Sequence, residues 1–126
     1  MTKDYHEYDI EDRLIDFAVR IIALIESLPK NKVGKHISGQ LLRSGTSPAP
    51  NYGEAQGAES RSDFIHKMKI CLKELRETRV WLKIIGKTKL IKPESKLKLI
   101  IEENDQLISI FVASIKTAKE NKIKTS

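Results

Sequence analysis

The chain has 126 residues, of which 40% are apolar and 32% are charged, and its net charge is +6. A chain of this size forms one domain, residues 1–126, with a hydrophobic core that needs no disulfides, and the composition excludes a disordered tail. The longest unbroken apolar run, IIALI, is far shorter than the roughly 18 residues that a membrane span needs, so we expect no membrane association.

The first predicted helix covers residues 10–28, and Pro29 ends it. One apolar face follows the spacing of three and four that buries a helix side, at Leu14, Phe17, Ala18, Ile21, Ile25 and Leu28. A second apolar stripe lies beside it, at Ile15, Val19 and Ile22. Because one stripe is enough to cover a core, we predict that the second is an oligomer interface. A wide buried face within one bundle is the alternative.

The second predicted helix begins near Lys32 and meets two prolines that disturb its hydrogen bonding, Pro48 and Pro50. One solution is a break after Gly45, with Ser47 capping a new helix whose first position is Pro48. The other is a kinked but continuous helix, in which serine or threonine hydroxyls compensate the freed carbonyls. In either case the inward residues are Val33, Ile37, Leu41 and Leu42.

The third and fourth predicted helices repeat apolar residues at alternating intervals of four and three. Ser60 is expected to cap the third, whose seam is Phe64, Met68, Cys71, Leu75, Thr78, Leu82 and Ile85. The fourth begins near Pro93 and continues with Leu97, Ile101, Asn104, Ile108, Phe111, Ile115 and Ala118. We therefore predict an all-α fold, an antiparallel four-helix bundle with the second helix kinked or interrupted near Pro48. Residues 1–9 and 119–126 are expected to fray.

Polar residues around the two prolines are predicted to serve packing rather than chemistry. If the helical phase persists, four polar residues between positions 44 and 54 line one side of the second helix. Two glutamates lie near the seam of the third helix, and we expect one of them to meet Arg43 or Asn51. Such a partly buried network fixes the register of two helices. Its predicted members are Arg43, Ser44, Ser47, Asn51, Glu54, Glu74 and Glu77.

Positive charge is concentrated in residues 61–100, which carry twelve basic and four acidic side chains, a net charge of +8. A basic segment of this kind attracts polyanions, chiefly RNA or DNA. A solvated lysine-rich face is the competing interpretation. The predicted phosphate-binding residues are Lys67, Lys69, Lys73, Arg76, Arg79, Lys83, Lys87, Lys89, Lys92, Lys96 and Lys98.

Catalytic and metal-binding patterns are sparse. The three histidines have no metal-ligand spacing and no glycine-rich phosphate loop occurs, so we expect no metal and no cofactor. The single cysteine, Cys71, is expected to be a buried apolar residue in a reducing cytoplasm. Arg61 and His66 have the spacing found in helical ribonucleases of the HEPN family, where arginine steadies phosphate and histidine moves a proton. Five helical steps, however, leave the two side chains about 140° apart, which disfavours an enzyme.

The stretch from Leu41 to Leu82 contains a specific combination of residues: Arg43, Ser44, Thr46, Ser47, Asn51, Glu54, Phe64, Glu74, Glu77 and Trp81. In this combination the chain resembles the bacterial four-helix bundle proteins encoded within intervening sequences of 23S ribosomal RNA genes, often labelled S23-type ribosomal proteins. The resemblance implies an up-down-up-down bundle without enzymatic activity and ring-like homo-oligomers, pentamers in particular. It also implies kinship with the accessory protein of diversity-generating retroelements, a basic pentameric bundle that binds nucleic acid and a reverse transcriptase.

Taken together, these features predict a non-enzymatic, cytoplasmic, homo-oligomeric bundle that binds RNA or DNA phosphates through a basic surface. A protein-interaction scaffold without nucleic-acid binding is the alternative. A HEPN-like ribonuclease is a further, less favoured one.

Overall fold

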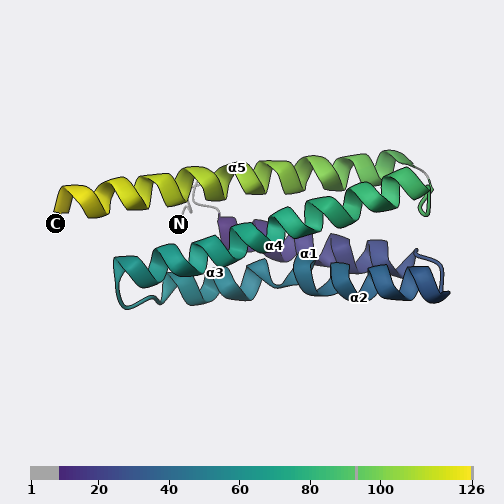
Figure 1. Cartoon of the computed structure of the whole chain (residues 1–126), viewed down its shortest axis with the longest axis horizontal. Helices are drawn as coiled ribbons and strands as arrows, with labels where there is room; N and C mark the ends of the chain where they lie inside the picture. The colour runs from purple at the N-terminus through teal and green to yellow at the C-terminus, as the bar shows by residue number, and fades with distance from the viewer. Residues whose placement is uncertain (1–8, 93, 126) are drawn as a thin grey trace, which may run out of the picture.

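The computed structural model describes residues 9–92 and 94–125, with side chains described up to residue 121. Five helical segments follow one another: α1 (Ile10–Glu26), α2 (Lys32–Thr46), α3 (Pro48–Gln56), α4 (Arg61–Thr88) and α5 (Glu94–Thr125). No strand occurs within these described ranges. α2 and α3 form one rod that bends at Ser47, so four rods run side by side (Figure 1).

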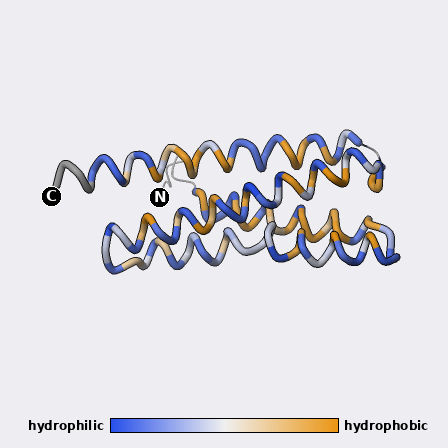
Figure 2. Tube along the Cα trace, viewed as in Figure 1, coloured by the Kyte–Doolittle hydropathy of each residue, from blue (hydrophilic) through white to orange (hydrophobic). Residues whose placement is uncertain are grey.

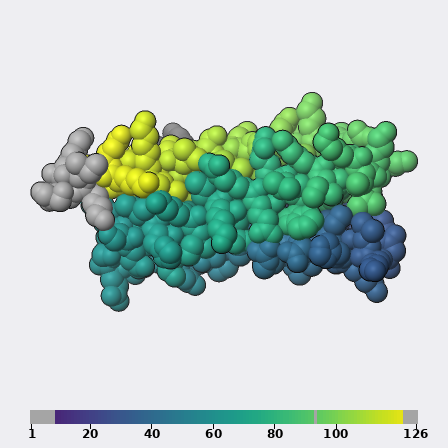
Figure 3. All heavy atoms as spheres, in the orientation of Figure 1, coloured from purple at the N-terminus to yellow at the C-terminus, as the bar shows by residue number. Residues whose placement is uncertain are grey.

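Successive rods pack against each other in antiparallel order. α1 packs on α2, the bent α2–α3 rod packs on α4, and α4 packs on α5, while α1 also contacts α5. On the face visible in Figure 3, α4 lies between α5 and the α2–α3 rod. The predicted antiparallel four-helix bundle is therefore confirmed.

The rods differ in length. α5 has 32 residues and α1 has 17, which correspond to about 48 and 26 Å at 1.5 Å per residue. The C-terminal end of α5 extends beyond the other helices (Figure 1). Of residues 1–9, which were expected to fray, residues 1–8 lie outside the described residues, and Asp9 caps α1. At the other end α5 continues to Thr125, because residues 119–125 contain no glycine or proline that would stop it.

Side-chain caps fix where three of the helices begin. The side chains of Asp9, Asn31 and Ser60 each accept a hydrogen bond from the backbone N–H three residues later. A cap of this kind contributes about 1 kcal/mol. The predicted cap at Ser60 is confirmed. α4 ends at Thr88, and its C-cap residue Lys89 adopts the left-handed conformation with φ of 57° and lets the chain turn toward α5.

The bend at Ser47 resolves the alternatives that the two prolines left open. Ser47 has helical torsion angles, φ −68° and ψ −27°, and its side chain caps nothing, so the version with a Ser47 side-chain cap is wrong. Its N–H donates to the Arg43 carbonyl and its carbonyl accepts from the N–H of Asn51, so the helical ladder continues through the bend. The Thr46 hydroxyl adds a bond of 2.6 Å to the Leu42 carbonyl one turn back. The rod is thus kinked but continuous.

Close packing of α1 against the bend depends on a glycine. A Cβ atom at Gly45 would lie 2.9 Å from both γ carbons of Ile21, which is fully buried. No real Cβ atom tolerates that distance without displacement of its neighbours. Gly45 therefore allows α2 to approach α1 at the point where the rod bends.

The core lies along the common axis of the rods, and hydrophobic and hydrophilic residues alternate along each helix as they turn toward or away from it (Figure 2). Phe17, Leu75 and Phe111 are among its largest fully buried side chains. The side-chain amide of Asn104 joins this core by donating a 3.1 Å hydrogen bond to the Leu75 carbonyl, which ties α5 to α4. None of the helices in the described ranges is both long enough and apolar enough to cross a membrane.

Several predicted inward positions shift by one residue. In α5, Ile100 and Leu107 are buried where Ile101 and Ile108 were predicted. Two adjacent apolar residues satisfy a periodic pattern equally well, and a straight helix drifts by about 20° per heptad from a strict seven-residue repeat. The same one-residue shift places Ile65 and Leu24 in the core. The predicted residues that are only half-buried are Ala18, Ile25, Phe64, Ile101 and Ile108.

In α2, two predicted core residues are wrong. Val33 and Leu42 are exposed, while Ile37 and Leu41 are buried as expected. The buried position next to Val33 is occupied by Gly34. The position must be a glycine, because an added Cβ would overlap the Pro29 carbonyl. Leu42 lies outside the core because its side chain points 100° away from that of Leu41 around the helix axis, and the buried face of α2 is too narrow to include both.

Candidate nucleic-acid interface

A row of exposed cations runs along the outer face of α4. Its members are separated by the intervals of three, four and seven that keep side chains on one side of a helix. At 100° per residue they fall within about 40° of a common direction, and at 1.5 Å per residue they extend over about 27 Å. Between Lys69 and Lys87 the only other residue in this register is the exposed Val80, so the register contains no carboxylate. Glu77 lies beside it, and the pKa of Glu77 is lowered by a hydrogen bond from Trp81 and in part by the charge of Lys73. We call this set the α4 row: Lys69, Lys73, Arg76, Lys83 and Lys87.

Two of the predicted phosphate-binding residues lie outside the row and have acidic partners. The ammonium of Lys67 donates to Glu54 at 2.8 Å, and that hydrogen bond raises the pKa of Lys67. Arg79 donates to Asp105 at 2.7 Å. Both cations are therefore partly neutralised within the chain. The remaining four lie exposed around the α4–α5 turn and the start of α5: Lys89, Lys92, Lys96 and Lys98.

Two cations on α5 were missed by the sequence analysis. Lys116 and Lys119 are exposed and lie across from Lys69 on α4. The pKa of Lys119 is lowered because its ammonium lies beside that of Lys69. Residues 101–126 carry four basic and four acidic side chains, so their net charge of zero concealed this local excess.

Arg43 lies between Glu74 and Glu77 of α4, the two glutamates predicted to lie near the seam. Its guanidinium donates to Glu74 at 2.8 Å and also to Glu77. Trp81 donates from Nε1 to Glu77 at 3.0 Å, and this bond, together with Arg43, holds the pKa of Glu77 below its usual range. The hydrogen bond to Glu77 in turn raises the pKa of Arg43. These contacts link the α2–α3 rod to α4 just before the bend.

The other members of the predicted polar network form separate contacts. Ser44 accepts a buried hydrogen bond of 2.9 Å from the Thr78 hydroxyl. Asn51 donates to the Ser47 carbonyl within the bent rod, at 3.0 Å, and does not meet a glutamate. Glu54 pairs with Lys67 instead. Only Arg43, Glu74 and Glu77 therefore form a connected cluster, and the buried Ser47 hydroxyl has no hydrogen-bond partner among the described residues.

Cys71 is completely buried and its Sγ donates a weak hydrogen bond of 3.6 Å to the Pro48 carbonyl. Burial raises the pKa of the thiol to about 12. A protonated, inaccessible thiol is neither a nucleophile nor a metal ligand. In the part of the chain that is described, no three histidine, cysteine, aspartate or glutamate side chains gather closely enough to hold a metal ion.

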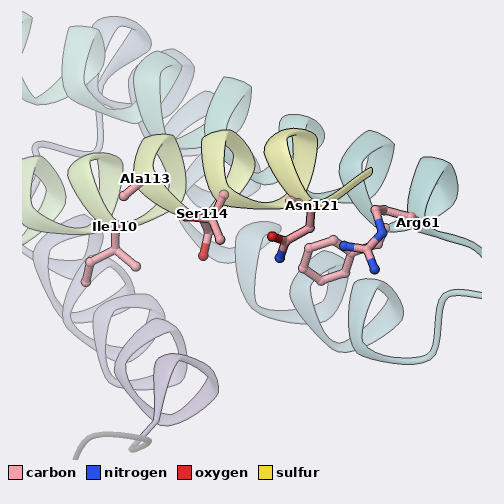
Figure 4. Close-up of a pocket in the computed structure, with 8 residues that line it drawn as sticks. Arg61, Ile110, Ala113, Ser114 and Asn121 are labelled. Carbon is pink, nitrogen blue, oxygen red and sulfur yellow. The ribbon is translucent and has the colours of Figure 1, made fainter. Parts of the chain in front are cut away.

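Arg61 and His66, the pair of the ribonuclease alternative, are not brought together in one cavity. A hollow of about 710 Å³ lies between the first turns of α4 and the last turns of α5, where Arg61 faces Asn121 (Figure 4). Its other described lining residues are Phe64, Ile110, Ala113, Ser114, Thr117 and Ala118. Neither His66 nor a carboxylate is among these described residues, so none of them could transfer a proton near pH 7.

The second stripe of α1 faces solvent. The exposed fractions are 45% for Ile15, 58% for Val19 and 45% for Ile22, whereas Leu14 and Ile21 beside them are buried. The alternative of a wide face buried within one bundle is therefore wrong. Three exposed β-branched residues therefore lie together on one side of α1.

The chain is similar to known proteins in both its sequence and its structure. The sequence model of the family described as 23S rRNA-intervening sequence protein matches residues 6–113. The chain is also similar to the crystal structure of a protein with unknown function from the S23 ribosomal protein family of Bacteroides thetaiotaomicron VPI-5482. The two share 37% sequence identity and a TM-score of 0.79, over 86% of this chain and 99% of that one. No curated protein sequence matches the chain.

Proposed function

Because the chain belongs to the 23S rRNA-intervening sequence protein family, we propose that it is a non-enzymatic, oligomeric helical bundle that binds RNA or DNA phosphates through the α4 row. The observation that carries this proposal is the common direction of five exposed cations, in a helical register that contains no carboxylate. Phosphate binding of this kind positions a nucleic acid without reading its sequence. The chain has few aromatic residues for stacking on bases, which supports the same interpretation.

The row makes a quantitative prediction about salt. If each of its five cations neutralises one phosphate of a duplex, the slope of log K against log salt concentration is about −4.5, from about −0.9 per contact. A surface of scattered, paired charges gives a much shallower slope. The salt dependence therefore measures how many cations of the row act together.

A non-enzymatic role is supported by the surroundings of the candidate catalytic groups. Arg61 lies in a hollow whose described lining residues include no proton-transfer group, and Cys71 is a buried thiol whose pKa is raised to about 12. The ribonuclease alternative still has a direct test. RNA that stays intact during long incubation with the wild-type protein removes it, while cleavage that is lost in His66→Ala restores it.

Self-association is proposed through the exposed stripe of α1. Burying Ile15, Val19 and Ile22 against a second copy removes apolar surface from water, at about 25 cal/mol per Å². An oligomer, such as the pentamer that the family resemblance implies, repeats the α4 row and multiplies a weak single-site affinity. We place this assembly in the cytoplasm, where the single buried cysteine stays reduced.

Fluorescence anisotropy with a labelled, structured RNA at low salt tests the proposal. The row variant is Lys73→Gln/Lys83→Gln/Lys87→Gln. The matched control removes the same number of exposed charges around the start of α2, as Lys30→Gln/Lys32→Gln/Lys35→Gln. The row variant is expected to weaken binding at least tenfold and to reduce the salt slope by about 2.7, at about 0.9 per lost contact.

Two results would overturn the proposal. One is no binding by the wild-type protein at tens of micromolar, the usual range of non-specific affinity. The other is equal weakening by the row variant and the control. The exposed α1 stripe then favours the protein-interaction scaffold, and a protein partner that remains bound after nuclease treatment would support it.

A further inference from the structure

The groove between α4 and the C-terminal half of α5 collects positive charge from two helices. Its volume is about 360 Å³, and α4 and the end of α5 lie side by side around it (Figure 3). We infer that this groove is a phosphate seat, in which an oligophosphate or a nucleic-acid backbone is held between two walls of cations. The inference rests on the proposed function and locates the phosphate contacts in this groove. The lining residues are Lys69, Leu72, Arg76, Val112, Ile115, Lys116 and Lys119.

The four cations of the groove come from both walls and have no acidic partner within it. Lys69 and Arg76 belong to the α4 row, while Lys116 and Lys119 belong to α5. No carboxylate is among the described lining residues. The α4 row thus acquires a second, parallel set of cations along part of its length. An anion in this position is contacted from two sides, whereas one on the outer face of α4 is contacted from one.

The adjoining hollow along the same two helices shows the contrast. It has a volume of about 450 Å³ and also includes Arg76, but there Asp105 from α5 pairs with Arg79 from α4. The charged residues that line the groove are therefore all cations, whereas the adjoining hollow contains a cation paired with a carboxylate. Of these two sites, only the groove offers an anion several cations without a carboxylate among the described lining residues.

Lys69 and Lys119 are held in an arrangement that favours an anion. Their ammonium groups lie beside each other, and the pKa of Lys119 is lowered as a result. Two like charges in contact repel each other unless an opposite charge lies between them. Glu120 follows Lys119 on α5 but does not line the groove. A phosphate bridging the two ammonium groups relieves the repulsion, and it does so with charge-assisted hydrogen bonds.

The floor of the groove suits a phosphodiester better than a free inorganic ion. Ile115 is buried and Leu72 is half-buried, while Val112 is exposed at the rim. An apolar floor contacts the carbon atoms of a sugar and gains from covering them, while the cations at the walls take the phosphate oxygens. A chain of alternating phosphates and sugars therefore matches both parts of the lining.

The test uses the full chain and two probes. Tripolyphosphate reports on the groove itself, by two-dimensional NMR of the backbone amides, and labelled RNA reports on the proposed function, by anisotropy. The groove variant is Lys116→Gln/Lys119→Gln, and the control is Lys30→Gln/Lys32→Gln, which also removes two exposed charges. Lys116→Arg/Lys119→Arg keeps the charges. Circular dichroism checks that all variants keep the helical fold.

The expected result has three parts. Tripolyphosphate shifts the amides of residues 69–76 and 112–119 in the wild-type protein. The groove variant loses at least about tenfold in affinity for both probes, because each charge-assisted hydrogen bond contributes roughly a factor of ten. The control and the arginine variant bind as the wild type does.

The outcomes separate the two proposals. If RNA binds but the groove variant matches the control and the groove amides do not shift, the seat is refuted while the proposed function stands. If tripolyphosphate shifts the groove amides but no RNA binds, the seat stands as an oligophosphate site and the proposed function fails. If a poly-glutamate peptide shifts these amides and tripolyphosphate does not, the groove belongs to an acidic protein partner and the inference is overturned.

Discussion

Gly45→Ala tests whether α1 and the bent rod meet as closely as the structure shows. Replacing glycine by alanine inside a helix normally stabilises a protein by about 0.5–1 kcal/mol. At Gly45, however, the new Cβ would lie 2.9 Å from Cγ1 and 2.9 Å from Cγ2 of Ile21, and 3.3 Å from its Cβ. Because both branches and the branch point are in contact, no rotation about χ1 removes the overlap. Overpacking of this kind costs about 1–3 kcal/mol.

Gly39→Ala is the matched control, since Gly39 lies in the same helix and an added Cβ would meet nothing within 4 Å. It is expected to gain the full benefit of about 0.5–1 kcal/mol. Gly45→Ala should therefore be less stable than Gly39→Ala by about 1–3 kcal/mol. Urea denaturation at one fixed protein concentration measures both, because self-association makes the midpoint depend on concentration.

A double-mutant cycle identifies the contact responsible. Ile21→Ala alone leaves a cavity in the core and is expected to cost about 2–5 kcal/mol. In the double variant the Gly45→Ala methyl group enters that cavity, so the two changes should be less than additive by about 0.5–3 kcal/mol. Equal stabilisation by Gly45→Ala and Gly39→Ala would refute the close approach, and so would strict additivity with Ile21→Ala.

Three further predictions concern single side chains. The pKa of Glu77 is lowered in the folded protein. The ionised carboxylate therefore contributes its full stability above the ordinary glutamate pKa, and this contribution is lost as the pH falls through the pKa of the folded state. The stability advantage of wild type over Glu77→Gln should thus shrink in acid, as measured by urea denaturation between pH 3 and 7. Cys71, with a pKa of about 12 and no exposure, should react with a thiol reagent only in urea, and rapid labelling of the native protein would contradict its burial. Val19→Asp places a charge on the exposed stripe of α1. It should lower the mass found by light scattering toward that of a monomer, while the helical signal in circular dichroism stays unchanged. An unaltered mass would show that α1 is not part of the interface.

The helices were predictable because their signals are local. The 4-3 repeat of α4 fixes which of its sides is buried, and once Leu75 and Thr78 face the core, Lys73, Arg76 and Lys83 must face outward. Ser60 was recognisable as a cap from its own chemistry. The α4 row therefore follows from the sequence of a single helix.

Features that depend on two helices were not predictable. Ile100 and Ile101 are adjacent and chemically identical, so only the packing of α5 on α4 decides which one is buried. The groove has the same origin, because Lys119 meets Lys69 only after the whole chain has folded. The net charge of a segment cannot reveal such a meeting, since carboxylates elsewhere on α5 cancel the lysines in the sum.

The unequal lengths of α1 and α5 give the two ends of the bundle different susceptibility to hydrogen exchange. Amides of α5 near Asn104 and Leu107 are enclosed by the other rods and should exchange only when the whole protein unfolds. The last turns of α5 extend beyond the ends of the other helices (Figure 1). Protection factors should therefore decline from this enclosed part of α5 toward its overhanging end.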